Sequence, residues 1–100
     1  GVEISVDVEH AQAASAAPAD SPVVLALEQA VERVYGVQPR PVGIGGATVA
    51  ALLRRKGLPA AVWACIQNTC HQPDERASIS AACKDAQVFA HILMRRDAHA

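Results

Sequence analysis

The sequence predicts an α/β fold, a partial three-layer sandwich with a parallel βαβ unit and three helices. Three observations lead to this prediction. Residues 60–66 form an unbroken apolar run, which is typical of a parallel strand buried on both faces. Residues 42–44, a glycine turn and a helical segment precede that run, so a right-handed crossover is expected. Residues 2–8 alternate apolar and polar side chains, the period of a strand with one buried face.

The first helix is predicted to follow Asp20-Ser21-Pro22, because a capping side chain before proline is typical of helix starts. Gly36 is expected to end this helix in the left-handed conformation. The apolar side chains between these signals share one helical stripe, which consists of Val23, Leu27, Ala30, Val31 and Val34.

Two more helices are predicted further along the chain. One spans 47–56, and its inward-facing side chains are expected to be Val49, Leu52 and Leu53. The other begins at Ser78 or Ser80 and runs to about Arg96. Its predicted buried face consists of Ala82, Ala86, Phe89, Ala90 and Leu93.

Length, charge and cysteine usage limit what the protein does. A chain of 100 residues forms one small domain at most, and the small-residue segment 11–19 is predicted to be a linker. The formal charge of −1, with both signs interspersed, gives no electrostatic reason to expect a nucleic-acid or membrane partner. No apolar stretch approaches the ~18 residues of a membrane span. Three cysteines without a CxxC pair favour a reducing, cytoplasmic location.

His71 is the strongest candidate for chemistry, because it directly follows the apolar run. Ligands of open α/β sheets bind just past the carboxyl ends of parallel strands. Asp74 and Glu75 follow His71, and imidazole and carboxylate groups are zinc ligands. These carboxylates either bind a metal, orient His71 or face solvent, and the local pattern leaves the three alternatives open. A Cys/His site with Cys65 and Cys70 is a poorer chelate.

The turn at Gly45 and Gly46 leads into a helix, and Thr48 lies in the first turn of that helix. Such a turn is either a site for carboxylate or phosphate, through free backbone N–H groups, or simply a tight connection that needs glycine. No Ser/His/Asp set and no second carboxylate cluster accompanies it. The sequence thus offers part of an active site.

Four segments carry a resemblance to a known family: DSPVVLALEQAVERVYG, PRPVGIGGATVAALLRRKGLPAAVW, CHQPDE and KDAQVFAHIL. They resemble the carboxyl-terminal portion of the dinuclear-zinc amidohydrolases and peptidases, the family of acetylornithine deacetylase, succinyl-diaminopimelate desuccinylase, aminoacylase and carboxypeptidase G. That family has an α/β catalytic domain interrupted by a lid domain that commonly mediates dimerisation. The resemblance implies that residues 1–10 are the last lid strand, 11–19 the linker, and 20–100 the carboxyl-terminal part of the catalytic domain.

The resemblance also implies a site. His71 matches the late histidine ligand of the second of two metal ions, usually zinc. Gly45, Gly46 and Thr48 lie where the family binds the carboxylate of its substrate, a peptide or N-acyl amino acid. Most metal ligands and the general base have no counterpart here, so no catalytic residue is assigned and the chain alone is expected to be inactive. The resemblance implies a homo-oligomer. The alternative is a standalone self-associating or binding module derived from such an enzyme.

Overall fold

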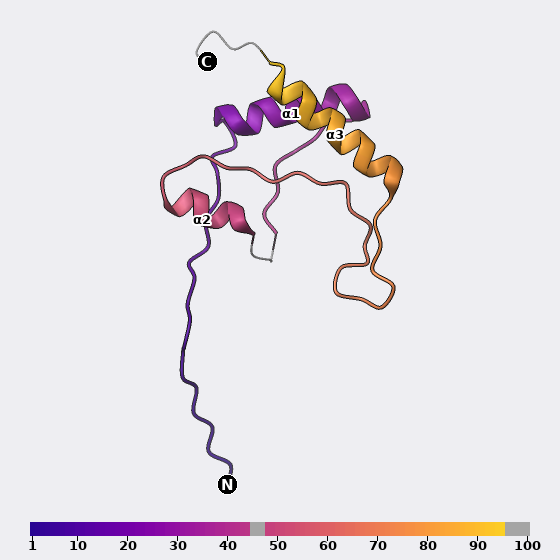
Figure 1. Cartoon of the computed structure of the whole chain (residues 1–100). Coiled ribbons are helices and arrows are strands. Elements are labelled where there is room, and N and C mark those ends of the chain that lie inside the picture. The colour runs from indigo at the N-terminus through magenta and orange to yellow at the C-terminus, as the bar shows by residue number, and fades with distance from the viewer. Residues whose placement is uncertain (45–47, 96–100) are drawn as a thin grey trace.

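The computed structural model describes residues 1–44 and 48–95, which contain three α-helices: α1 (Pro22–Tyr35), α2 (Val49–Arg55) and α3 (Ile79–Leu93). Figure 1 shows α1 and α3 side by side, α2 apart from them, and the amino-terminal segment running away from the body as an open chain. Within the described ranges, no helix has the length and apolar character that crossing a bilayer requires.

The packed part of the molecule is the interface between α1 and α3. Its buried residues are Ala30 and Val31 of α1 and Val88 of α3. Val31 is 1% and Val88 is 0% exposed, so these two valines form the centre of the core. Half-buried side chains surround them, and these are Leu27, Val34, Tyr35, Trp63 and Ile92. Because Trp63 comes from the open chain after α2, the core joins three segments that are distant in sequence.

The helix ends follow the signals in the sequence. α1 begins with Pro22 after the N-cap residue Ser21, as predicted, but the predicted capping by a side chain is wrong, because the Ser21 hydroxyl makes no hydrogen bond to the helix. Gly36 ends it with a φ of 66°, and its N–H donates to the carbonyl of Glu32 at 2.9 Å, which confirms the left-handed cap. At the start of α3, the hydroxyl of Ser78 accepts the N–H of Ala81 at 3.2 Å. Ser78 is therefore the capping residue of α3.

The predicted α/β fold class is wrong. Residues 2–8, 42–44 and 60–66 form no strand, so the described part of the chain has no βαβ unit, sandwich sheet or lid strand. The alternating pattern of residues 2–8 and the apolar run 60–66 indicate only a local preference for extended backbone. A strand also requires a neighbouring segment whose N–H and C=O groups pair with its own. The apolar side chains of the first segment are accordingly uncovered, since Val2 is 91% and Val8 is 75% exposed.

The predicted buried face of α3 is also wrong. Phe89 is 47% and Leu93 is 84% exposed, whereas Val88 is fully buried and Ile92 packs against the core. α3 has two apolar stripes a short rotation apart, and the periodicity of 3.6 fits both. Contact with α1 selects the stripe that contains Val88, and the other stripe stays open to solvent.

α2 is shorter than predicted and packs differently. It spans 49–55 rather than 47–56, and residue 47 lies outside the described residues. Its predicted inward side chains Val49, Leu52 and Leu53 are exposed, and Ala50 is the buried residue of the helix. The expected inward direction depended on a covering sheet, which the described residues do not form.

Candidate functional site

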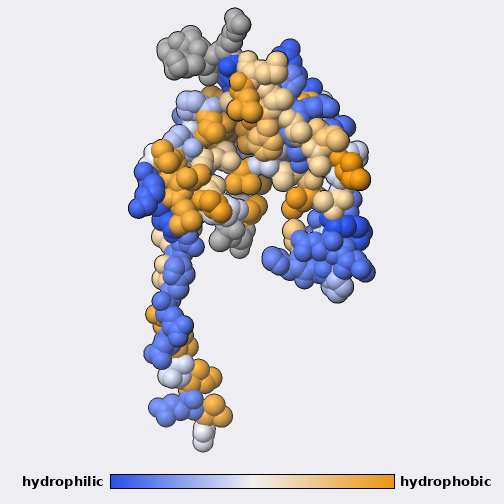
Figure 2. Space-filling view, viewed as in Figure 1, coloured by the Kyte–Doolittle hydropathy of each residue, from blue (hydrophilic) through white to orange (hydrophobic). Residues whose placement is uncertain are grey.

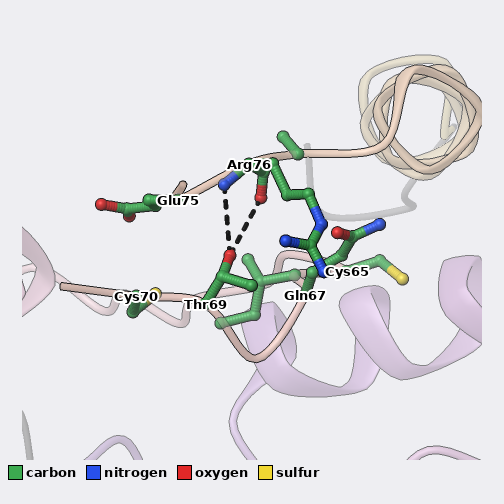
Figure 3. Close-up of a pocket in the computed structure, with 8 residues that line it drawn as sticks. Cys65, Gln67, Thr69, Cys70, Glu75 and Arg76 are labelled. Atoms are coloured by element: carbon green, nitrogen blue, oxygen red, sulfur yellow. Dashed lines mark hydrogen bonds between the residues drawn. The ribbon is translucent and has the colours of Figure 1, made fainter. Parts of the chain in front are cut away.

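The loop that carries His71 is closed at its base by one side chain. The hydroxyl of Thr69 accepts the N–H of Arg76 at 3.2 Å and donates to the carbonyl of Arg76 at 3.3 Å (Figure 3). Within the loop, the N–H of Gln72 donates to the carbonyl of Thr69 at 3.1 Å. Thr69 is 9% exposed, and it is the buried polar residue of the described chain. The stem of the loop is thus fixed by a side chain shielded from water.

His71 is exposed within this loop, two residues after Thr69. Its backbone φ is 59°, and that of Asp74 is 58°, so both residues adopt the left-handed conformation. For an L-residue this conformation costs roughly 1–2 kcal/mol. In Figure 2 the loop is a hydrophilic lobe that projects from a more hydrophobic body. The loop therefore presents the imidazole to solvent on a short, fixed stem.

The described residues do not build a complete metal site around His71. In residues 1–44 and 48–95, no three His, Cys, Asp or Glu side chains come close enough to hold a metal ion. A catalytic zinc needs three protein ligands and an open position. Asp74, Glu75 and Cys70, the neighbours considered from the sequence, therefore do not join His71 in a ligand set. The imidazole fits the donor chemistry of zinc, but only as one ligand.

Of the predicted carboxylate-binding residues, the structure describes only Thr48. Gly45 and Gly46 lie outside the described residues. Thr48 is the N-cap residue of α2, half-buried, with a φ of −135° and no side-chain hydrogen bond to the helix. Its hydroxyl therefore makes no cap contact at the helix start, and the role of the turn stays a prediction.

Asp85 of α3 forms a site that the sequence reasoning missed. Its Oδ1 accepts the hydroxyl of Tyr35 at 2.6 Å and the indole N–H of Trp63 at 2.9 Å. Its Oδ2 accepts the backbone N–H of Cys65 at 2.9 Å. One carboxylate thus connects the end of α1, the middle of α3 and the open chain after α2. The signal available in the sequence was an aspartate on the same helical stripe as Val88.

Aromatic packing supports this hydrogen-bond cluster. The rings of Tyr35 and Trp63 meet edge to face, with centroids 5.6 Å apart and an interplanar angle of 64°. The ammonium group of Lys84 lies 5.3 Å from the centroid of the Tyr35 ring, within the range of a cation–π contact. The single tyrosine and the single tryptophan of the chain are therefore both used to join α1, α3 and the connecting segment.

The cluster moves the pKa of Asp85 and the pKa of Tyr35 further from 7, so Asp85 is ionised and Tyr35 is neutral at neutral pH. Burial is the largest influence on the Asp85 carboxyl and raises its pKa. Hydrogen bonds from Tyr35, from the Cys65 N–H and from Trp63 together outweigh burial and lower the pKa below its ordinary value of 3.8. The pKa of Tyr35 is raised above its ordinary 10.0, first by its hydrogen bond to Asp85. This arrangement positions segments and leaves neither group ready to exchange a proton near pH 7.

The free energy of unfolding is expected to fall in acid through Asp85. Its pKa is lower in the folded chain than in the unfolded chain, so its contribution is present above the ordinary value of 3.8 and is lost as pH falls through the lower folded pKa. Urea unfolding between pH 7 and pH 2 measures the change. Asp85→Asn is the control, because it keeps every other carboxyl group of the chain, and its free energy of unfolding should fall less between pH 7 and pH 2. An equal loss in both proteins would contradict the role of Asp85.

Comparison with known proteins identifies the class. Residues 2–95 match the sequence model of peptidase family M20/M25/M40, and the chain belongs to this family. The sequence-based resemblance is thereby confirmed at the level of the family.

Individual relatives agree with this result. An uncharacterized metallohydrolase of Methanococcus maripaludis is 37% identical over 92 residues, which cover 92% of this chain and 22% of the relative. One of Methanocaldococcus jannaschii is 34% identical over 91 residues, covering 91% of this chain and 22% of the relative. A succinyl-diaminopimelate desuccinylase of Sulfurovum sp. is 31% identical over 70 residues, which cover 70% of this chain and 19% of the relative. The chain thus spans about a fifth of the length of these relatives. No solved structure matches it significantly.

Proposed function

We propose that this chain is the carboxyl-terminal part of a zinc-dependent amidohydrolase or peptidase, in which His71 holds one of two metal ions. The observation that carries the proposal is the exposed His71 on a loop whose stem is fixed by Thr69, within a chain of the M20/M25/M40 family. A zinc ion in such a site supplies Lewis-acid polarisation of an amide carbonyl. The role of this chain is to hold the imidazole out from the body on a short stem.

Uncovered apolar surface supports the proposal that the chain is inactive alone. The side chains of residues 2–8, the outer stripe of α3 and most of α2 are open to solvent. Isolated folded domains rarely expose so many large apolar side chains together, and such surfaces mark contacts with other protein. The shortage of metal ligands in the described residues points the same way. Further elements of the catalytic domain are the proposed cover, and they would also supply the remaining ligands.

The proposed substrate has an amide bond and a free carboxylate, as in a peptide or an N-acyl amino acid. Gly45, Gly46 and Thr48 are proposed to receive that carboxylate, because a glycine turn before a helix offers free backbone N–H groups. Deacylation is favoured by the desuccinylase among the relatives, whose name describes removal of an acyl group. The three cysteines are exposed and free, which supports a reducing, cytoplasmic compartment.

Zinc binding and hydrolysis measured on the same sample test this proposal. The chain is expected to bind zinc weakly, to lose most of that binding in His71→Ala, and to hydrolyse no N-acetyl amino acid. His91→Ala, which removes another exposed histidine, is the matched control and should bind zinc like the parent. Equal zinc affinity in His71→Ala and the parent would remove His71 from the metal site. Rapid metal-dependent hydrolysis by the chain alone would refute its incompleteness.

The second candidate is a standalone module that associates with copies of itself. The observation in its favour is the open segment 2–8, whose apolar side chains Val2, Ile4, Val6 and Val8 are exposed along an unpaired backbone. Homo-oligomers, and dimers in particular, fit such a surface. Light scattering on the zinc-binding samples separates the two candidates, because a clean monomer at micromolar concentration counts against the module.

A further inference from the structure

A groove of about 350 Å³ lies beside the stem of the His71 loop. It opens between the chain at 65–70 and the returning chain at 75–77. Its size is at the lower end of the range of small-molecule pockets, about 300 to 1,000 Å³. The base of the groove is held by Thr69, whose hydroxyl contacts both backbone polar groups of Arg76. The groove is therefore attached to the best-fixed part of the loop.

Arg76 provides the positive charge of this groove. Figure 3 shows its side chain turning across the groove toward the side where Gln67 and Cys65 lie, while Glu75 points away at the opposite end. Within the described ranges, the hydrogen bonds of Arg76 use its backbone, and its guanidinium has no ion-pair partner. A guanidinium stays charged at any physiological pH and presents a planar fork of donors. The fork is thus available to an anion that enters the groove.

We propose that this groove binds a small organic monocarboxylate with a short hydrocarbon body. Arg guanidinium and carboxylate match as two parallel hydrogen bonds, and the amide of Gln67 can donate a third. Most of the remaining lining is apolar and includes Ile66 and Ala77, which suits a hydrocarbon body better than a fully hydrated ion. Glu75 also lines the groove, at the end opposite the Arg76 guanidinium, and its carboxylate repels a phosphate dianion more strongly than a singly charged ligand. The proposal does not depend on whether His71 holds a metal.

Titration of the whole chain with butyrate, without added metal, tests the site. Amide NMR signals of Thr69, Arg76 and Gln67 should shift saturably in the millimolar range. Arg76→Gln should weaken butyrate binding by at least about tenfold, since hydrogen bonds between charged partners are the strong ones. The variant should keep its fold, because Thr69 contacts only the backbone of residue 76. Arg76→Lys keeps the positive charge but lacks the planar fork of donors. Its affinity for butyrate should lie between that of the parent and that of Arg76→Gln.

Matched controls make the outcome decisive. Arg40→Gln removes an exposed arginine outside the groove and should bind butyrate like the parent. Butyramide, which has the same body without the charge, should cause no saturable shift. Absence of saturable binding, equal binding by Arg76→Gln, or tighter binding of inorganic phosphate than of butyrate would each overturn the proposal. Butyrate binding in a chain whose zinc binding does not depend on His71, or zinc binding at His71 in a chain that binds no butyrate, would separate this inference from the proposed metal site.

Discussion

Replacing Val88 by aspartate is expected to abolish the packing of α1 against α3. Val88 is fully buried and contacts the core formed with Ala30 and Val31. An uncompensated charge at such a position costs about 3 to 5 kcal/mol. A chain of this size has only about 5 to 15 kcal/mol of stability in total. Circular dichroism during urea unfolding should therefore show a largely unfolded chain, or a transition at much lower urea.

Phe89→Asp is the matched control, because it introduces the same charge at the next residue of the same helix. Phe89 is 47% exposed, so the new carboxylate remains hydrated and the loss should stay within about 1 kcal/mol. The pair distinguishes the observed orientation of α3 from the one predicted by the sequence pattern, in which Phe89 is buried. A larger loss for Phe89→Asp than for Val88→Asp would refute the observed orientation.

Replacing Asp85 by alanine is expected to lower the free energy of unfolding by about 2 to 4 kcal/mol. The substitution removes the acceptor of three donors, and hydrogen bonds to charged groups are worth about 1.5 to 3 kcal/mol each before solvent replaces some of them. The hydroxyl of Tyr35 and the indole of Trp63 then lose their carboxylate partner. Trp63 is the single tryptophan, so its fluorescence reports the same change directly during urea unfolding.

Two variants show whether the loss comes from these hydrogen bonds. Asp85→Asn keeps an acceptor oxygen without the charge, so it should lower the free energy of unfolding less than Asp85→Ala does. Asp7→Ala removes an exposed carboxylate on the open amino-terminal segment and should change stability by less than about 0.5 kcal/mol. If Asp85→Ala were as stable as Asp7→Ala, the carboxylate would not hold the three segments together.

The helices were predictable because their signals are local. Pro22 after Ser21, the left-handed Gly36 and the Ser78 hydroxyl act within one turn of the helix ends they define. The family was predictable for a similar reason, since the chain from the Gly45–Gly46 turn to the His71 loop carries its motifs in linear order. The helices and the family therefore followed from residues close together in the chain.

Two features were not predictable in this way: that the strand-like segments stay unpaired, and that the candidate groove forms. Residues 2–8 and 60–66 carry the patterns of strands, but the pairing that makes a strand depends on segments distant in sequence. The groove depends on Thr69 meeting the backbone of Arg76, and such a contact leaves no periodic pattern. Asp85 was missed because its three donors come from other parts of the chain.

By itself, the sequence determined three helices, the left-handed Gly36 end of α1, a serine cap at the start of α3, the family and the position of His71 after an apolar run. Only the tertiary structure decided which stripe of α3 is buried, that Asp85 joins three segments, and that the His71 loop closes on Thr69. The reason is physical. Caps and helical propensity act over a few residues, whereas burial and strand pairing depend on which surfaces meet, and two apolar stripes on one helix offer equally good local solutions.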